Sequence, residues 1–594
     1  MGNTPSFTYS PLDGDEIRLL KLLPSSSSDK IRCSISHFPF PSCPGYTALS
    51  YTWGGSFWIR IIELNGYEFT VRSNLHAFLE EAQERFKRGT FNPGLGLETE
   101  HDGDGGRWFW IDAMCINQED IPERNAQVLR MKDIYEKAER IICWLGSVPL
   151  FADGAAAIKV LDYLSDLSQK YPNNKDRSHD EALIRESLGP RSQKFTDMDW
   201  HSLKKMLHAP WWSRAWVVQE ASTPKVLGRK VIWYGPYERS FRCFPKVNGV
   251  LLLAKNRPEI TKLQQEAYSS SASLLNNMRW ARKNERGENT LLLLDALPDM
   301  RLYDATDPRD KVFAILAICK DGKHPDLAPH YEDSMEEVFT NLAAHILHRD
   351  KCLDILGHCH YSRRAPSLPT WVPDWTSNWV ALAFSHRRET TLEQVYNACF
   401  AIPAAIGIDR TTRTLRLRGI KFDEVISVGL TRNDDARITP DVDVFTNWLS
   451  LTSRLGNDYI SGGTVSEALQ HTLCADIKES SQWRGQDERG GRVPLPGDSN
   501  GIPQDFLRRS LNLHRRTVRR CLVTTRKEYL ALAPQETERG DLLCVLYGGQ
   551  LPLVLRQSGS CFELIGEAYV HGIMDGEAVV GRSLKGEEQE FKIC

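Results

Sequence analysis

The chain has 594 residues, and its 74 basic and 77 acidic residues give a formal charge of −3. Apolar residues form 41% of the chain, which excludes wholesale disorder and is enough for several packed domains. The near-neutral charge excludes a protein built mainly to coat nucleic acid. The absence of an apolar run of about 18 residues excludes a membrane-spanning helix.

The first folded stretch is expected from about Gly45, so residues 1–44 are predicted to be an N-terminal extension. This segment lacks the charged start and apolar stretch of a secretory signal. Gly2 and Ser6 match the N-myristoylation pattern, but no basic cluster nearby would strengthen membrane binding. The 14 cysteines include no Cys-x-x-Cys pair. Together these features indicate reduced thiols and a cytoplasmic protein.

Strands and amphipathic helices alternate between residues 45 and 222. Asn65-Gly66 separates two strand-like runs, the signature of a hairpin, and an apolar helical stripe follows Ser73. Further apolar strands are expected at residues 109–111 and 141–145, with a helix between them. This alternation predicts an α/β domain with a mostly parallel, doubly wound sheet. Residues 89–106 are predicted to form a loop, and residues 169–194 a polar insertion.

The remaining chain divides into two further regions. Residues 223–400 show a mixed, largely helical pattern. Within them, Asp307 before Pro308, with Asp310 three residues on, is typical of a capped helix start. From residue 401 the apolar period changes to two, which predicts a β-rich C-terminal domain interrupted by a polar segment at residues 476–503.

The chain lacks the short motifs of common enzymes and metal sites. It has no Walker-type loop, no His-Glu-x-x-His and no Gly-x-Ser-x-Gly. His358-Cys359-His360 does not have the paired spacing of a structural zinc site, so no metal is predicted. The basic cluster at residues 508–520 fits a solvated face or a docking edge better than a nucleic-acid interface.

Three ordered blocks carry a specific resemblance to a known family. They are Tyr46-Thr-Ala-Leu-Ser-Tyr-Thr-Trp-Gly54, then Trp110-Ile-Asp-Ala-Met-Cys-Ile-Asn-Gln-Glu-Asp120, and Arg214-Ala-Trp-Val-Val-Gln-Glu220. In this order they resemble the heterokaryon incompatibility (HET) domain of filamentous fungi, over roughly residues 46–221. Later stretches at residues 305–313, 371–375 and 566–572 resemble the region that follows this domain in such proteins.

The resemblance implies a role in non-self recognition, in which fusion of incompatible cells triggers cell death. It also implies a distant relationship to Toll/interleukin-1 receptor (TIR) domains, which have a flavodoxin-like sheet. Leu49-Ser50-Tyr51 is similar to the first TIR box. Trp216 and Glu220 resemble the Trp-Cys-x-x-Glu segment that carries the catalytic glutamate of NAD-cleaving TIR domains. The sequence departs from that segment at Val217, which replaces the cysteine.

Cleavage of nicotinamide from NAD would need one carboxylate to stabilise an oxocarbenium-like transition state, because the leaving group is already cationic. Glu220 is the candidate catalytic residue, and NAD would be a substrate, with no cofactor expected. Arginines could bind the pyrophosphate, tryptophans could stack on a ring, and polar residues after strand ends could line the pocket. The candidate ligand-binding residues are Ser50, Trp53, Asp112, Asn117, Gln118, Arg124, Arg214 and Trp216.

Each of these residues also has a structural interpretation. Glu220 can pair with Arg214 in a buried network, the polar residues can cap loops, and the tryptophans can be core. Cys115 is an alternative nucleophile, although no histidine lies beside it in the sequence. Two hypotheses therefore stay open. The first is a TIR-like enzyme acting on NAD. The second is a non-enzymatic signalling module that self-associates or binds an incompatibility partner.

Overall fold

A computed structural model of the chain divides into two compact units, Met1–Asp333 and Ser334–Cys594. Most of the predicted loop 89–106, insertion 169–194 and polar segment 476–503 lies outside the described residues, and the predicted domain boundaries stay predictions. The structure describes residues 7–24, 30–55, 57–91, 108–170, 186–188, 194–222, 228–244, 247, 250, 291–377, 381, 383–384, 396–433, 442–476, 516–580 and 586–594.

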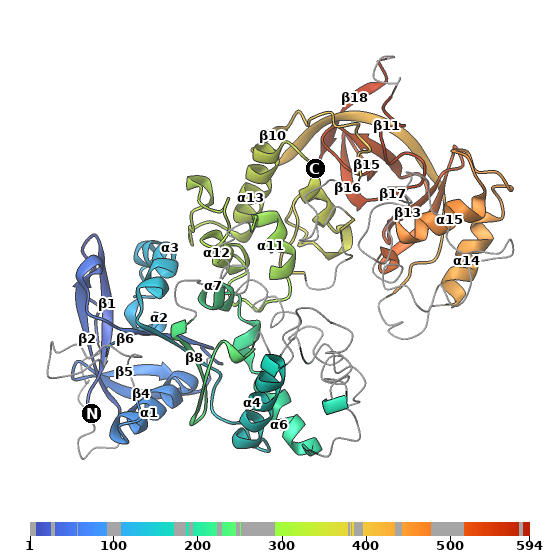
Figure 1. Cartoon of the computed structure of the whole chain (residues 1–594). Helices are drawn as coiled ribbons and strands as arrows, with labels where there is room; N and C mark the ends of the chain where they lie inside the picture. The colour runs from blue at the N-terminus through green and yellow to red at the C-terminus, as the bar shows by residue number, and fades with distance from the viewer. Residues whose placement is uncertain are drawn as a thin grey trace. The chain divides into compact units, whose positions relative to one another are not determined.

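The first unit is built on one nine-stranded sheet with the strand order β5-β4-β2-β1-β6-β3-β7-β8-β9 (Figure 1). Its strands are β1 (Glu16–Leu22), β2 (Arg32–Pro39), β3 (Thr47–Tyr51), β4 (Ile59–Leu64), β5 (Tyr67–Arg72), β6 (Trp108–Trp110), β7 (Arg140–Trp144), β8 (Lys230–Tyr234) and β9 (Tyr237–Ser240).

Parallel pairing is confined to part of this sheet. β6, β3, β7 and β8 are mutually parallel, and β2 runs parallel to β4. The pairs β1–β2, β1–β6, β4–β5 and β8–β9 are antiparallel. The prediction of an α/β domain is confirmed, but a mostly parallel sheet is wrong, because hairpins flank the parallel centre on both sides.

The segment predicted to be an N-terminal extension supplies two strands of this sheet. β1 lies between β2 and β6, and Ile17, Leu19 and Leu20 are fully buried. The sequence did not show this strand because residues facing both sides of it are buried, which removes the apolar–polar alternation of a half-exposed strand.

Helices cover both faces of the sheet, because neighbouring residues of a strand point to opposite sides. On β6, the Phe109 ring lies 5.9 Å from Phe78 of α1, and the Trp110 ring lies 5.6 Å from Tyr135 of α3. Figure 1 shows α1 and α3 on opposite sides of the strands. Among the described residues, the α-helices of this unit are α1 (Ser73–Lys87), α2 (Asp112–Cys115), α3 (Ile121–Lys137), α4 (Gly154–Lys170), α6 (Asp197–Leu207), α7 (Val217–Ser222), α11 (Leu293–Met300) and α12 (Asp310–Leu316).

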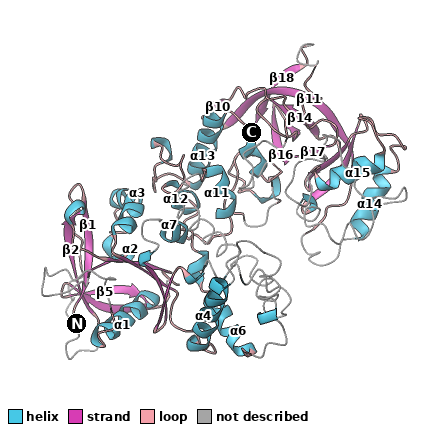
Figure 2. Cartoon of the chain, in the orientation of Figure 1, coloured by secondary structure: helices cyan, strands magenta, loops and turns pink. Residues whose placement is uncertain are grey.

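The second unit is β-rich, as predicted, with helices α13 (Met335–Asp350), α14 (Val442–Thr452) and α15 (Val465–Cys474) (Figure 2). β11 pairs with both β14 and β18, so β14, β15, β16, β18 and β11 close into a ring. Beyond a register shift at Val425, β11 continues into a second layer with β12, β13 and β17. The strands are β10 (Gly407–Asp409), β11 (Thr414–Val428), β12 (Arg520–Thr525), β13 (Leu530–Pro534), β14 (Leu542–Leu546), β15 (Leu553–Ser558), β16 (Cys561–Glu567), β17 (Tyr569–Val570) and β18 (Glu588–Ile593).

One prediction about the cysteines is wrong. Cys561 at the start of β16 and Cys594 after β18 form a disulfide, whereas the other 12 cysteines are free thiols. The two strands meet where Phe562 pairs with Ile593, which brings these cysteines, 33 residues apart, side by side. Within the described residues, no helix is both long enough and apolar enough to cross a membrane.

Candidate functional site

The Ser50 hydroxyl and the Glu220 carboxylate meet at the carboxyl end of β3. The hydroxyl donates a hydrogen bond to Glu220 Oε2, and the indole Nε1 of Trp211 donates to Ser50 Oγ at 2.7 Å. Ser50 is 0% exposed and Glu220 1% exposed. This contact joins the central strand to α7, the short helix that precedes β8.

Cations surround the buried carboxylate. Arg214 Nη1 lies 3.6 Å from Glu220 Oε2, and Lys230 Nζ donates to the Ala221 carbonyl at 2.7 Å. Burial raises the pKa of Glu220, and the charge of Arg214 and the Ser50 hydrogen bond oppose that rise. Burial alone would lower the pKa of Arg214, but the charges of Glu220 and Asp112 raise it. Arg214 therefore stays cationic between two carboxylates.

Asp112 also interacts with the Arg214 charge, and it is hydrogen-bonded to Trp53. Asp112 begins α2 directly after β6, and Trp53 Nε1 donates to Asp112 Oδ2 at 2.9 Å. The Arg72 guanidinium lies 5.3 Å from the centre of a Trp53 ring. Burial raises the pKa of Asp112, while Arg214 and the Trp53 hydrogen bond act against it. Five predicted site residues are thus brought together: Ser50, Trp53, Asp112, Arg214 and Glu220.

This arrangement suits a structural role better than chemistry on a bound substrate. The Glu220 carboxylate is closed to solvent, and its oxygen Oε2 already binds Ser50 and faces Arg214. A substrate ribose could reach it only after the surrounding elements moved. Cys115 is no better placed as a nucleophile, because burial raises the pKa of its thiol to about 12.

Two other predicted residues, Arg124 and Trp216, belong to a second cluster. The Arg124 guanidinium lies 3.4 Å from the Tyr331 ring centre, and its Nη2 lies 3.5 Å from Asp307 Oδ2. Trp216 is hydrogen-bonded to Asp310, which also accepts a 2.6 Å bond from the Tyr331 hydroxyl. These two residues therefore fix α12 and the 331 region to the sheet domain.

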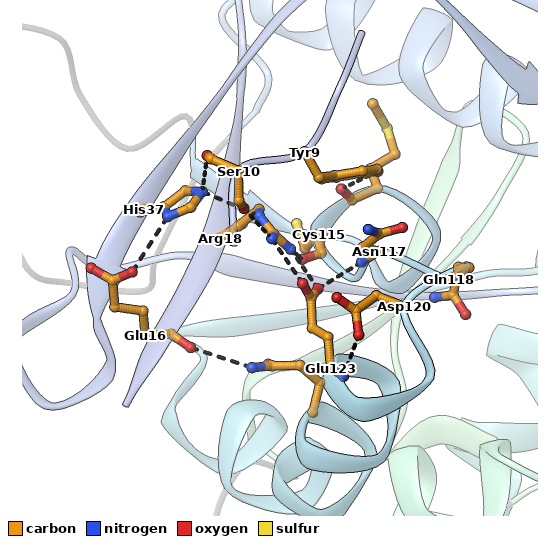
Figure 3. A network of polar contacts seen from close by, with 12 residues as sticks. Tyr9, Ser10, Glu16, Arg18, His37, Cys115, Asn117, Gln118, Asp120 and Glu123 are labelled. Atoms are coloured by element: carbon orange, nitrogen blue, oxygen red, sulfur yellow. Dashed lines mark hydrogen bonds and ion pairs between the residues drawn. The ribbon is translucent and has the colours of Figure 1, made fainter. Parts of the chain in front are cut away.

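The last two, Asn117 and Gln118, belong to a third cluster (Figure 3). The backbone N–H of Asn117 donates to Glu123 Oε1 at 2.7 Å, and the side-chain Nε2 of Gln118 donates to the backbone carbonyl of Asp112 at 3.0 Å. Arg18 of β1 is 1% exposed and holds Glu123 through two hydrogen bonds of 2.5 and 2.9 Å. Asn117 and Gln118 thus stabilise the loop between α2 and α3, which Glu123 connects to Arg18 of β1.

Sequence reasoning missed the central members of the second and third clusters. Arg18 lies in the segment that the sequence predicts to be an N-terminal extension. The signal that could have identified it is an arginine among apolar residues, because an arginine in a buried strand requires an acidic partner. Asp310 was interpreted only as part of a helix start. α12 does begin at Asp310. The Asp307 carboxylate binds Arg309, accepting from its guanidinium Nη2 and Nε at 2.7 and 2.8 Å and from its backbone N–H at 3.1 Å.

Two family models match parts of this chain. Residues 46–220 match the family model described as heterokaryon incompatibility protein (HET), and residues 508–591 match the Het-6 beta-barrel domain. The chain therefore contains a HET domain and a Het-6 beta-barrel domain. It is 25% identical, over 94% of each chain, to heterokaryon incompatibility protein 6, OR allele, of Neurospora crassa. No solved structure matched it.

Proposed function

We propose that this chain acts in the cytoplasm of a fungal cell in non-self recognition, as a signalling module that works by protein association and leads to cell death. The HET domain, and the similarity to an incompatibility protein along nearly the whole chain, support the biological role. The proposal assigns no cofactor and no metal to this module.

One observation carries the mechanism: the β4–β5 hairpin exposes a group of large apolar side chains at the edge of the sheet. β5 is the outermost strand of this sheet, and none of the described strands pairs with its outer edge, which therefore offers backbone groups for pairing. Exposed apolar side chains beside the edge of a sheet suit pairing with another chain, and a second copy is the partner we propose. The exposed side chains are Phe57 (93%), Trp58 (70%), Ile59 (53%), Ile61 (50%) and Tyr67 (40%).

The state of Glu220 supports a non-enzymatic module. A catalytic carboxylate must touch the reacting atoms, and Glu220 is 1% exposed and bound to Ser50 and Arg214. Its burial fits the structural interpretation, in which the carboxylate fastens α7 to the central strand.

NAD cleavage by a TIR-like domain is the second candidate. The observation that favours it is the meeting of Ser50, Asp112 and Glu220 around Arg214 at the carboxyl ends of parallel strands, the region where α/β sheets bind ligands. In this candidate function Glu220 would act only after α7 and the Trp211 segment opened.

Expression of the full chain in a fungal host, with NAD content and viability followed together, separates the two candidates. Glu220→Gln removes the charge but keeps the volume and an oxygen that accepts from Ser50. This variant also leaves Arg214 without its paired charge and should be less stable than the parent, so the two are compared at equal levels of folded protein. At equal levels we expect the variant to kill cells as the parent does, at unchanged NAD. NAD loss that depends on Glu220, and disappears together with toxicity in Glu220→Gln, would reject association alone.

A second pair of variants tests the surface. Ile61→Lys places a charge on the exposed hairpin, whereas Leu129→Lys places one on an equally exposed apolar position of α3, 53% exposed. We expect Ile61→Lys to reduce self-association by at least tenfold and to abolish cell death, and Leu129→Lys to change neither. Equal self-association of the two variants in analytical ultracentrifugation would reject the hairpin as the contact surface.

A further inference from the structure

A cleft of about 640 Å³ lies at the carboxyl ends of the parallel strands β7 and β8 in the first unit. This is the rim at which open α/β sheets bind their ligands, and the volume lies within the usual range for a small-molecule site. Glu220 does not line it. Six residues define its polar part: Ser73, Asn74, Ser147, Lys205, His208 and Tyr234.

The first turn of α1 borders this cleft through Ser73, Asn74 and Ala77. The helix has 15 residues, and no side chain caps its N-terminus. The Asn74 side chain is bonded at both ends, because its Nδ2 donates to the Thr52 carbonyl at 2.6 Å and its Oδ1 accepts from Trp144 Nε1 at 2.9 Å. Asn74 thus holds the positive end of the helix against the ends of β3 and β7.

Two side chains that line the cleft, Tyr234 and His208, each carry a buried polar atom that has no hydrogen-bond partner among the described residues. Tyr234, the last residue of β8, is 1% exposed, and its hydroxyl makes no hydrogen bond. His208 Nδ1 donates to the Lys204 carbonyl at 2.8 Å, and its Nε2 is buried and unpaired. Leaving such groups unpaired costs free energy, so this site is poised for a ligand that both accepts and donates hydrogen bonds.

The charge around the cleft is positive. Lys205 is exposed, forms no ion pair with a described residue, and lies close enough to His208 to lower the pKa of that imidazole, although burial is the larger cause. No acidic residue occurs among the described residues that line the cleft. Its remaining wall is apolar and contains Leu145, Pro149 and Pro210.

We propose that this cleft binds a small phosphorylated molecule with an apolar body. The phosphate would sit at the N-terminus of α1, which favours anions, with Lys205 as its counter-charge. Both polar atoms are buried, so a shift of the side chains around them would have to open them to the cleft. The Tyr234 hydroxyl would then donate to a phosphate oxygen, and a phosphate O–H would donate to His208 Nε2. The apolar part would lie against Leu145, Pro149 and Pro210. The proposal concerns binding alone and does not depend on the function proposed for Glu220 or the hairpin.

Calorimetric titration of the full chain with phenyl phosphate tests it, with phenol as the uncharged probe. We expect phenyl phosphate to bind at least tenfold more tightly than phenol. Lys205→Ala and Tyr234→Phe should each weaken binding about fivefold to tenfold. Lys87→Ala, at the opposite end of the same helix, is the matched control and should bind as the parent does.

Tyr234→Phe separates loss of binding from loss of folding. It removes only a hydroxyl that has no partner, so its melting temperature in the absence of the probe should equal or exceed that of the parent. Failure of the parent to bind phenyl phosphate at millimolar concentration would overturn the proposal. So would equal affinity of Lys205→Ala, Tyr234→Phe and the parent, or equal binding of phenol and phenyl phosphate.

Discussion

The hydroxyl of Ser50 donates its hydrogen bond to the carboxylate of Glu220, a residue 170 positions away in the chain. Ser50 comes from the central strand, and Glu220 from a helix between two later strands. The bond therefore ties the start of the HET domain to its end. Because Arg214 lies beside the same carboxylate, a buried ion pair and a hydrogen bond share one atom, Glu220 Oε2.

Removing one partner of the Glu220–Arg214 ion pair should lower the stability of the fold. Glu220→Ala leaves the Arg214 charge buried with one carboxylate neighbour fewer, so we expect the free energy of unfolding to fall by about 3–5 kcal/mol. Glu220→Met combined with Arg214→Met should cost less than the sum of the single changes. Urea titration followed by tryptophan fluorescence measures both. Glu119→Ala, at an exposed neighbour of the site, is the control and should change stability by no more than about 0.5 kcal/mol. Additive effects of the paired substitutions would contradict the coupling.

The N-terminal 44 residues should be indispensable for the HET domain. Arg18 on β1 is the buried partner of Glu123, so Arg18→Met should destabilise the fold by about 3–5 kcal/mol. Lys30→Met removes a nearby ion pair whose side chains are 58% and 50% exposed, and should cost less than about 1 kcal/mol. Thermal unfolding compares the two. A chain that starts at residue 45 and unfolds at the parent's temperature would contradict this role of β1.

The sequence predicted those parts of the fold whose pattern is local. The hairpin at Asn65-Gly66, the α1 stripe and the buried strands β3 and β7 follow from residues within one turn or strand, and the structure contains them. β1 was missed because residues on both of its faces are buried, so it lacks the apolar–polar alternation of a half-exposed strand. The disulfide was missed because only the pairing of β16 with β18 brings Cys561 and Cys594 together.

The sequence identified residues of the candidate site, but it could not predict which of them contact one another. The position of Asp112 after a strand end predicted that it lies at the sheet rim. Trp216 and Glu220 are four residues apart, and the sequence around them does not indicate that they have different partners. Trp216 is bonded to Asp310 and Glu220 to Ser50, and both partners come from segments far away in the chain. Burial of Glu220 is likewise a tertiary property.

The Cys561–Cys594 disulfide should stabilise the second unit. It closes a loop with a sequence separation of 33 and fastens the C-terminal strand β18 beside β16. Constraint of the unfolded chain by such a loop corresponds to about 3–4 kcal/mol. Dithiothreitol should therefore lower the melting temperature of the parent. Cys561→Ser should melt at that lower temperature with or without the reductant. Parent curves that do not respond to the reductant would show that the bond does not form in solution.

Asp310 should make stability fall as the pH rises towards neutrality. Burial raises the pKa of its carboxyl from 3.8 to about 6, against hydrogen bonds from Tyr331 and Trp216 that favour the ionised form. A pKa that is higher in the folded chain means that the folded state holds this proton more tightly. The contribution is fully present below about pH 4 and is lost as the pH rises through about 6.

Two substitutions at this pair should move stability in opposite directions with pH. Asp310→Asn cannot ionise but still offers an oxygen to Tyr331, so it should match the parent at pH 4 and be more stable at pH 7, by at most about 3 kcal/mol. Tyr331→Phe removes a donor to the carboxylate and should be more harmful at pH 7 than at pH 4, since only the ionised form depends strongly on that bond. Urea titrations at pH 4, 5, 6 and 7 measure both differences. A stability difference between Asp310→Asn and the parent that is the same at all four pH values would mean that Asp310 keeps one protonation state throughout, and would refute this assignment.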